Sequence, residues 1–337
     1  MSIDLRQLRY FITILERGSL ARAATSLNVA QPALSHHVRN MEAYLGTRLL
    51  LRGPKGVRAT EAGETLARHA RTILGQLAAA EEEIRGHERE PAGDVRLALP
   101  GTISEILAVP LLSAVRENYP KVKLRIAEAM SGFVLEWMRQ GRADLGVIYS
   151  HVAEEGLSTS RLLDEELVFF GRTANDPAGI AASGDAMSFA QLCDFPLIVP
   201  GEAHGLRHLL DAKAEAAGIS CNIAMEVDAY SNIKSLVEAG FGYSVLPLNA
   251  IKQEVASGSL TYWRVENPAL QRSVNLLFSV DRPATNAVAA VVRCIYECLR
   301  DLPGNGGWMG VANVAQPSAF DLLDRRSLTG AEARPTE

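Results

Sequence analysis

The side chains best suited to chemistry lie on one face of a predicted helix that begins at Gln31. Gln31-Pro32 suits a first helical turn, because proline has no N–H to lose there. The groups that follow could hydrogen-bond to the edges of bases in a DNA groove. With Pro32 at the tip, this predicted face comprises Gln31, Pro32, Ser35, His36 and Arg39. Apolar residues at helical spacing predict that the opposite face is buried through Leu34, Val38, Met41 and Leu45.

A shorter helix is expected just before this one. Leu20, Ala23, Ala24 and Leu27 recur at helical spacing, and Asn28 then tolerates a turn conformation. Two short helices joined by a tight turn, with a cationic face outward on the second, indicate a helix-turn-helix over residues 20–39. The pattern alone leaves open an ordinary amphipathic helix pair in an all-α domain.

A basic segment surrounds this motif. Residues 1–60 hold nine Lys or Arg against three Asp or Glu, a net charge of +6, so the whole-chain charge of −5 leaves −11 on the remainder. A basic module on an acidic body is typical of local contact with a polyanion. Residues 47–59 read as a short hairpin, or wing, whose expected phosphate contacts are Arg52, Lys55 and Arg58. The alternative is a solvated, charged turn.

Several motifs in this region carry a resemblance to a known family. GSLARAATSLNVAQPALSHHVRNMEAYLGTRLLLR and GVRATEAG resemble the amino-terminal signature of LysR-type transcriptional regulators. HARTIL at 69–74 and DLGVIYSH at 144–151 resemble the nitrogen assimilation control branch, and the likeness covers roughly residues 3–302. It implies a winged helix-turn-helix DNA-binding domain over 3–60 and a sequence-specific, oligomeric regulator of transcription that binds double-stranded DNA.

A long helix is expected over residues 61–90. Thr60 is a suitable N-cap, and Pro91-Ala92-Gly93 end the helix. Its apolar positions are spaced alternately four and three residues apart, a narrow seam with little to bury against in its own chain. We therefore expect a dimerisation helix with a seam formed by Leu66, Ala70, Ile73, Leu77, Ala80 and Ile84.

From residue 94 to 302 the pattern alternates between strand and helix. Such alternation predicts parallel sheets with right-handed crossovers, and the fold class is α/β. The segments 95–100, 122–129 and 144–150 are expected strands of one lobe, and 167–172, 196–200, 223–227 and 243–247 of a second. Residues 275–280 and the helix over 284–301 would return the chain to the first lobe. Two lobes joined by two crossing strands resemble the periplasmic-binding-protein-like regulatory domain of the family.

Polar residues follow the strands of both lobes. In open α/β sheets, ligands bind at the carboxyl ends of strands, where helix N-termini offer free N–H groups. The expected effector contacts are Thr102, Ser104, Ser131 and His204, and Ser231 is expected to cap a helix as Ser131 does. Helix capping alone would explain each hydroxyl equally well. By resemblance, Thr102 and Ser131 fall at effector-contacting positions and His204 on the opposite wall. The expected effector is a small anionic metabolite, although some members of the branch act without one.

The sequence predicts no enzyme. No catalytic residues, metal ligands or cofactor-binding loop form a convincing set, and the dispersed His151, His204 and His208 are better interpreted as surface or cleft residues. The four cysteines are scattered, and Cys294 and Cys298 suit core packing better than half a metal site. The alternative function is a cytoplasmic α/β solute-binding protein or enzyme with a helical appendage, which leaves the basic amino terminus unexplained.

The remaining expectations concern location, partners and the carboxyl terminus. A charged amino terminus and the lack of a long apolar run favour a cytoplasmic protein with no membrane partner. The protein itself is an expected partner, as a dimer or tetramer, and RNA polymerase is another if transcription is activated. Residues 303–337, rich in Gly, Pro, Ser and charge, are expected to form a largely disordered tail.

Overall fold

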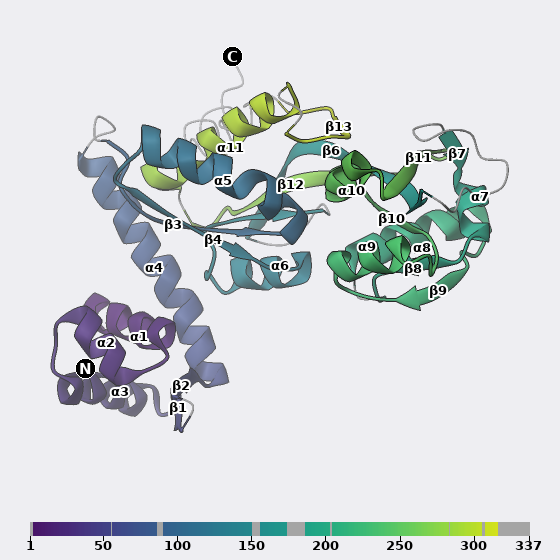
Figure 1. Cartoon of the computed structure of the whole chain (residues 1–337). Helices are drawn as coiled ribbons and strands as arrows, with labels where there is room; N and C mark the ends of the chain where they lie inside the picture. Colours follow the sequence, from purple (N-terminus) through teal and green to yellow (C-terminus); the bar gives the residue numbers. More distant parts are fainter. Residues whose placement is uncertain are drawn as a thin grey trace, which may run out of the picture.

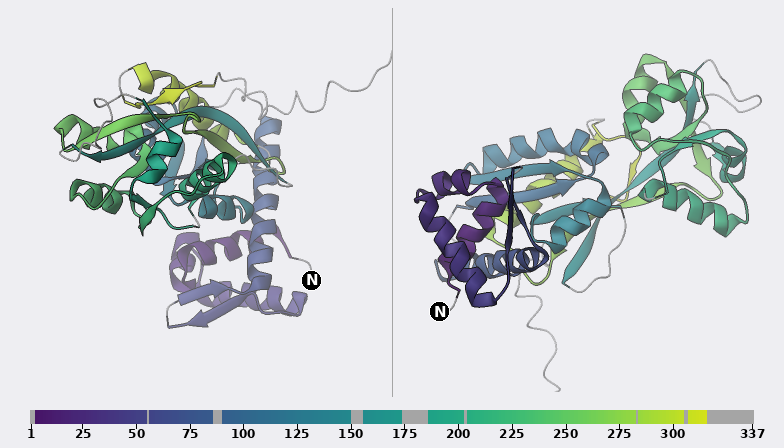
Figure 2. Two further views of the ribbon diagram at one scale, coloured as in Figure 1. Left: turned by 90° about the vertical axis from the view of Figure 1, so that its right-hand side faces the viewer. Right: turned by 90° about the horizontal axis from the view of Figure 1, so that it is seen from below.

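The structure, a computed structural model, consists of an N-terminal helical domain, a long connecting helix and a two-lobed α/β region (Figures 1 and 2). It describes residues 3–54, 56–85, 90–149, 156–173, 186–202, 204–282, 284–304 and 307–315. The predicted fold class is confirmed: a winged helix-turn-helix precedes two lobes built on mixed sheet and covering helices.

Three helices form the N-terminal domain: α1 (Leu5–Arg17), α2 (Leu20–Leu27) and α3 (Gln31–Leu45). Local residues set their ends. Asp4 and Gln7 form a capping box at α1, Ser19 caps α2, and Asn28 ends α2 in the left-handed region at φ 54°. The apolar faces close over one core that contains Phe11, Ile14 and the predicted Leu34, Val38 and Met41. Leu45, predicted to be buried, is exposed at the last position of α3.

The predicted wing is present as β1 (Leu50–Gly53) paired antiparallel with β2 (Gly56–Ala59). The Glu42 side chain of α3 accepts hydrogen bonds from the N–H groups of Leu49 and Leu50 at 2.9 and 3.2 Å, so α3 itself anchors the wing. Gly56 lies at φ 107°, and a Cβ there would meet the Gly18 carbonyl oxygen at 2.5 Å. Only glycine allows the wing to approach the α1–α2 turn this closely.

The connecting helix α4 (Glu61–Arg85) begins after Thr60, whose hydroxyl accepts a hydrogen bond from the Gly63 N–H at 3.0 Å. The prediction that this helix has little to bury within its own chain is wrong for its first half. Ala70 is fully buried in the N-terminal core and Leu66 packs at its edge, because α1 lies against α4 there. Beyond that contact the seam is open: Ile73 is 43% exposed and Ile84 is 85% exposed.

The first lobe is a sheet covered by helices on both faces. β3 (Gly93–Leu99) pairs in parallel with β4 (Val122–Glu128) and β5 (Leu145–Ile148). On one face, α5 (Gly101–Asn118) packs beside α11 (Asn286–Gly304) over the largest apolar core of this lobe. On the other face, α6 (Ser131–Arg139) covers a smaller core that contains Val134, Met138 and Leu277.

Two strands carry the chain between the lobes. The 16-residue β6 (Leu157–Arg172) pairs through its first half with β12 (Gln271–Ser279) in the first lobe. Its second half pairs with β10 (Ser244–Pro247) and β11 (Leu260–Glu266) in the second. Only residues 167–172 of β6 were predicted, because serines and charged residues interrupt the apolar pattern of its first part. The strand β11 was missed as well. One mixed sheet therefore runs through both lobes (Figure 1).

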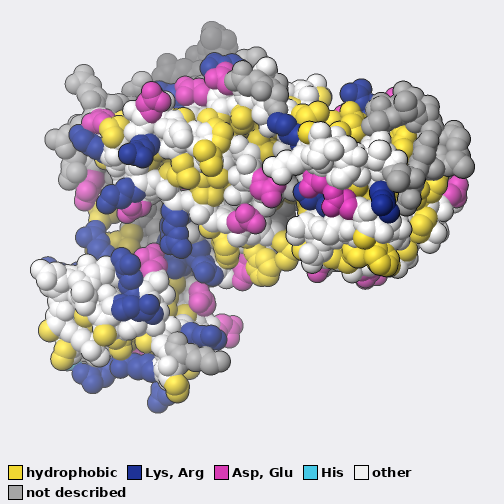
Figure 3. Space-filling model, in the orientation of Figure 1, with side chains coloured by type: hydrophobic (Ala, Val, Ile, Leu, Met, Phe, Trp, Pro, Cys, Tyr) yellow, Lys and Arg dark blue, Asp and Glu magenta, His cyan; other side chains and the backbone are white. Residues whose placement is uncertain are grey.

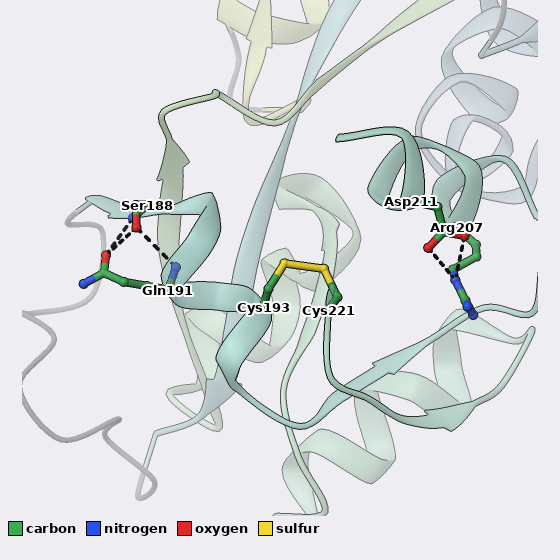
Figure 4. The surroundings of a disulfide bond; sticks show 6 residues. All are labelled: Ser188, Gln191, Cys193, Arg207, Asp211 and Cys221. Atoms are coloured by element: carbon green, nitrogen blue, oxygen red, sulfur yellow. Dashed lines mark hydrogen bonds and ion pairs between the residues drawn. A yellow bond between two sulfur atoms is a disulfide. The ribbon is translucent and has the colours of Figure 1, made fainter. Parts of the chain in front are cut away.

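The second lobe adds shorter elements around its own core. Parallel strands β8 (Leu197–Val199) and β9 (Ile223–Glu226) lie with α8 (Gly205–Ala217) and α9 (Tyr230–Glu238) (Figure 1). The remaining elements are β7 (Ala186–Ser188), α7 (Phe189–Asp194), the 3₁₀ turn Leu248–Ile251 and α10 (Lys252–Ser257). Cys193 of α7 and Cys221 form a disulfide (Figure 4), so the expectation that all four cysteines are scattered is wrong for this pair.

The chain does not become structureless after α11, which corrects the expectation of a disordered tail for residues 307–315. Trp308 is 2% exposed within the core of the first lobe, whereas Met309 packs against the core of the second. β13 (Val311–Ala312) pairs antiparallel with β6, and the Glu166 N–H donates to the Gly310 carbonyl at 2.7 Å. This segment therefore straps both lobes together beside the crossing strands. The rest of the predicted tail lies outside the described residues.

Candidate DNA interface and interlobe site

The predicted polar face of α3 is presented to solvent. Gln31, Pro32, His36 and Arg39 are exposed and Ser35 is half-buried, whereas the opposite face of the helix is buried as far as Met41. The Asn40 side-chain amide lies 3.1 Å from Nε2 of His36, which restrains that imidazole. The outward face therefore offers hydrogen-bonding groups on a helix whose position is fixed by its core.

The wing continues this surface with positive charge. Arg52 and Arg58 are exposed on β1 and β2, whereas Lys55 lies outside the described residues. Figure 3 shows Lys and Arg side chains along the lower edge of the N-terminal domain and at its junction with the first lobe. A protruding helix with a basic hairpin beside it suits a groove bounded by phosphates.

A second polar cluster lies where β6 and β12 cross. Arg272 of β12 stands opposite Glu165 of β6 in the sheet register, and both side chains are buried. The Arg272 Nε donates to Glu165 Oε2 at 2.8 Å, and its guanidinium lies 3.6 Å from the centre of the Tyr149 ring. Tyr149 in turn shares a 2.5 Å hydrogen bond with the hydroxyl of Thr102. The predicted Thr102 is thus tied to the crossing strands.

The second lobe reaches the same cluster through Tyr230 and His204. Burial raises the pKa of Tyr230, and the charge of Arg272, followed by a hydrogen bond with it, opposes that shift. The ring centres of His204 and Tyr230 are 5.5 Å apart. His204 is also the N-cap of α8, since its Nδ1 accepts from the Leu206 N–H at 3.1 Å. Burial, followed by the charge of Arg272, lowers the pKa of His204, so its neutral form is favoured.

The predicted serine positions Ser104, Ser131 and Ser231 make no contact with this cluster that the described contacts show. Ser104 is half-buried in the first turn of α5, close to Thr102 in the chain. Ser131 is the first residue of α6, and its side chain lies outside the described set. The predicted capping by Ser131 and Ser231 is wrong, because the N-caps are Met130 and Ala229 and neither makes a side-chain capping bond.

Sequence reasoning missed the centre of this cluster: Tyr149, Glu165, Tyr230 and Arg272. One signal was available, since the acidic run at 164–166 interrupts an apolar segment and Arg272 lies two residues from both Leu270 and Val274. A charge in such a place must find a partner. The partner itself could not be identified, because the two residues are more than 100 positions apart in the chain.

The described part of the chain offers little other chemistry. No three His, Cys, Asp or Glu side chains there lie close enough to hold a metal ion. Cys294 and Cys298 are free thiols packed in the core of the first lobe, and burial raises the pKa of Cys298 to about 11. None of the helices described is long and apolar enough to cross a membrane.

Comparison with known proteins assigns the family. The model of the LysR substrate-binding domain matches residues 88–299, and the lysR-family bacterial regulatory helix-turn-helix model matches residues 5–64. The chain belongs to the LysR family. It is a transcriptional regulator with a helix-turn-helix DNA-binding domain and an effector-binding domain, as the resemblance implied.

Relatives and solved structures agree with this assignment. The nitrogen assimilation regulatory protein nac of Klebsiella aerogenes is 30% identical over 301 residues, which is 89% of this chain and 95% of that protein. Its counterpart in Escherichia coli K12 is 29% identical over 300 residues, covering 88% and 94%. A variant of full-length OxyR from Pseudomonas aeruginosa superimposes with a TM-score of 0.77 at 23% identity, covering 94% of this chain and 100% of that one. That likeness concerns the fold of this LysR-family chain.

Proposed function

We propose that this LysR-family regulator reads DNA through the outward face of α3. Gln31, Ser35, His36 and Arg39, with Pro32 at the tip, would contact base edges in the major groove, and Arg52, Lys55 and Arg58 would contact phosphates. The single observation that carries the proposal is the exposed hydrogen-bonding face of a helix whose other face is buried through Leu34, Val38 and Met41. The anchoring of the wing by Glu42 supports it, since base contacts and phosphate contacts then move as one body.

Gel shifts over a range of salt concentrations test this proposal on an operator found by footprinting the region upstream of the neighbouring divergent gene. Arg39→Ala should weaken operator binding by about 1–3 kcal/mol and relax base preference. Arg52→Ala should weaken all sequences alike and reduce the salt slope by roughly one. Arg116→Ala, an exposed arginine of α5, is the matched control. Operator affinity unchanged in both test variants would contradict the assignment.

We propose that the open part of α4 pairs two chains and sets the spacing of two half-sites. Ile73, Leu77, Ala80 and Ile84 would form the contact, whereas Leu66 and Ala70 serve the N-terminal core of their own chain. Ile73→Asp with Leu77→Asp would place unpaired charges in the contact, which is strongly unfavourable. Sedimentation should show smaller assemblies and weaker operator binding, and the exposed Phe241→Asp should show neither. An unaltered assembly would mean that the lobes alone hold the chains together.

We propose that the interlobe cluster binds a small polar metabolite, with an anionic group favoured by the N-terminus of α5. Thr102, Ser104 and Ser131 would contact it from the first lobe and His204 from the second. The support is the meeting of both lobes at Arg272. Because Glu165 already neutralises Arg272, the helix end and neutral donors, rather than this guanidinium, would hold the anion.

Calorimetry against organic acids and amino acids tests the effector. Thr102→Val removes a hydroxyl at nearly constant size and should abolish the effector response while leaving basal operator binding intact. Ser113→Ala, on the same helix, is the control. If no compound binds and reporter output follows only the amount of protein, regulation acts through expression level. In either case we propose that the protein acts in the cytoplasm on the chromosome, and with RNA polymerase where it activates.

A further inference from the structure

A groove separates the N-terminal domain from the first lobe, and it shares only Arg58 of the wing with the described residues of the two sites above. Its volume is about 1280 Å³, and it is lined by residues of α1, β2 and α4 on one side and by β3, β4 and residues near the end of α6 on the other. Figure 3 shows Lys and Arg side chains gathered at this junction. Among the described residues, eight Lys or Arg line the groove against four Asp or Glu, a net charge of +4 for this set.

Three arginines surround the turn after α6. Gly141 of that turn is tightly packed: a Cβ there would lie 3.2 Å from the Arg71 side chain and 3.4 Å from Nη1 of Arg282. Arg71 of α4 donates through Nη1 to the Gln140 carbonyl at 2.9 Å, and Arg282 donates to the Met138 and Ala143 carbonyls. Arg142, the exposed third arginine, extends over Trp137 at 5.6 Å. Guanidinium groups from α4 and from the first lobe therefore converge.

The carboxylates of the groove do not balance these charges. The Arg96 side chain donates two hydrogen bonds to the Asp144 carboxylate, at 3.1 and 2.8 Å. Nη1 of Arg282 lies farther from this carboxylate, at 3.8 Å. The buried Nε of Arg71 has no hydrogen-bond partner in the described part of the chain. Burial, and then repulsion by Arg96, lowers the pKa of Arg71, and the charges of Glu16 and Glu64 oppose this shift without cancelling it. An added anion would favour the charged guanidinium further.

The face of α4 that lines the groove is not the proposed pairing seam. Arg71, Leu74, Gly75 and Ala78 line the groove. At 100° per residue, Arg71, Gly75 and Ala78 lie about 100° or more around the helix from Ile73, Leu77 and Ile84, and Leu74 lies between the two faces. A second chain paired along the seam would therefore leave the Arg71 side of the groove free.

We propose that this groove binds a phosphorylated small molecule, with its phosphate held by Arg71, Arg142 and Arg282. Arginine forks match phosphate oxygens in bidentate geometry, and a dianion suits a groove with a surplus of positive charge. Because Arg71 belongs to the helix that carries the DNA-binding domain and Arg142 and Arg282 belong to the lobe, the bound phosphate fixes one against the other. The site provides a second input, independent of the interlobe cluster.

Calorimetry with inorganic phosphate, in the full-length protein without DNA and at constant ionic strength set with KCl, tests the inference. Wild-type protein should show saturable binding at one site per chain. Arg142→Gln, an exposed substitution that should not disturb folding, should weaken it at least tenfold, and Arg71→Gln should do the same. Arg116→Gln on α5 is the matched control and should bind within twofold of wild type.

A further arm separates a free phosphate compound from the DNA backbone as the source of the phosphate. A non-specific DNA duplex, titrated over a range of salt concentrations, should bind Arg142→Gln and wild type with equal affinity and equal salt slope. A lower slope in the variant would assign the groove to DNA and overturn the proposal. So would the absence of saturable phosphate binding to wild type, or equal phosphate binding by wild type and Arg142→Gln.

Discussion

Removal of the Trp308 side chain should measure how much the C-terminal strap, residues 307–315, contributes to holding the two lobes together. Trp308 is 2% exposed in the core of the first lobe, so Trp308→Ala leaves a cavity lined by apolar side chains. Buried Trp→Ala changes cost about 3–5 kcal/mol. The indole Nε1 is buried without a hydrogen-bond partner among the described residues. Removing this unpaired donor should therefore offset part of the destabilisation. We therefore expect about 3 kcal/mol.

Thermal unfolding of the full-length protein, followed by circular dichroism, is the assay. For a domain of about 200 residues, 1 kcal/mol corresponds to roughly 2–4 °C, so Trp308→Ala should lower the midpoint of the lobe transition by about 6–12 °C. Trp308→Phe should recover most of the loss. Phe241→Ala, which replaces an aromatic side chain that is 57% exposed, should shift the midpoint by under 2 °C.

A second variant separates the tryptophan from the rest of the strap. Truncation after residue 304 also removes the Glu166–Gly310 hydrogen bond and the bond from the Asn313 side chain to Asp164 at 2.8 Å. It should therefore destabilise the lobes more than Trp308→Ala does. A midpoint for Trp308→Ala within 2 °C of wild type would refute the reasoning, because a tryptophan that packs in a core cannot be removed without cost.

The remaining predictions concern buried groups. The pKa of His204 is lower in the folded chain than in the unfolded one, so the unfolded chain binds the proton first as pH falls. Stability should therefore decrease as pH drops below about 6.5. His204→Asn keeps a capping oxygen and should lessen this loss in unfolding curves measured from pH 7.5 to 5.5. Glu165→Ala leaves the buried Arg272 charge unpaired and should cost about 3–5 kcal/mol in urea unfolding, with Glu165→Gln milder. Under oxidising conditions the denatured protein should show only the two thiols of α11. Reduction of the Cys193–Cys221 disulfide should lower the free energy of unfolding by about 2–4 kcal/mol. Equal thermal midpoints with and without reductant would contradict this.

Local chemistry made the N-terminal domain predictable from its sequence. The turn after α2 depends on Asn28, the start of α3 on Pro32 and the start of α4 on Thr60, and each acts within three or four residues of its own position. Periodicity then identified the outward face of α3, because a helix with one apolar stripe has one way to bury it. The alternation of strands and helices predicted the two lobes for the same local reason.

Tertiary structure decided what depends on residues far apart in the chain. Ala70 belongs to the core of its own chain because α1 packs on it, which no periodicity within α4 reveals. Trp308 lies in the core of the first lobe because its segment pairs with β6, which is some 150 positions earlier in the chain. Arg272 and Glu165 neutralise each other only after β6 and β12 pair, and Arg71 meets Arg282 only after α4 is placed against the first lobe. Burial and charge compensation are properties of such contacts, so the sequence determined the elements and the folded chain determined which charges meet.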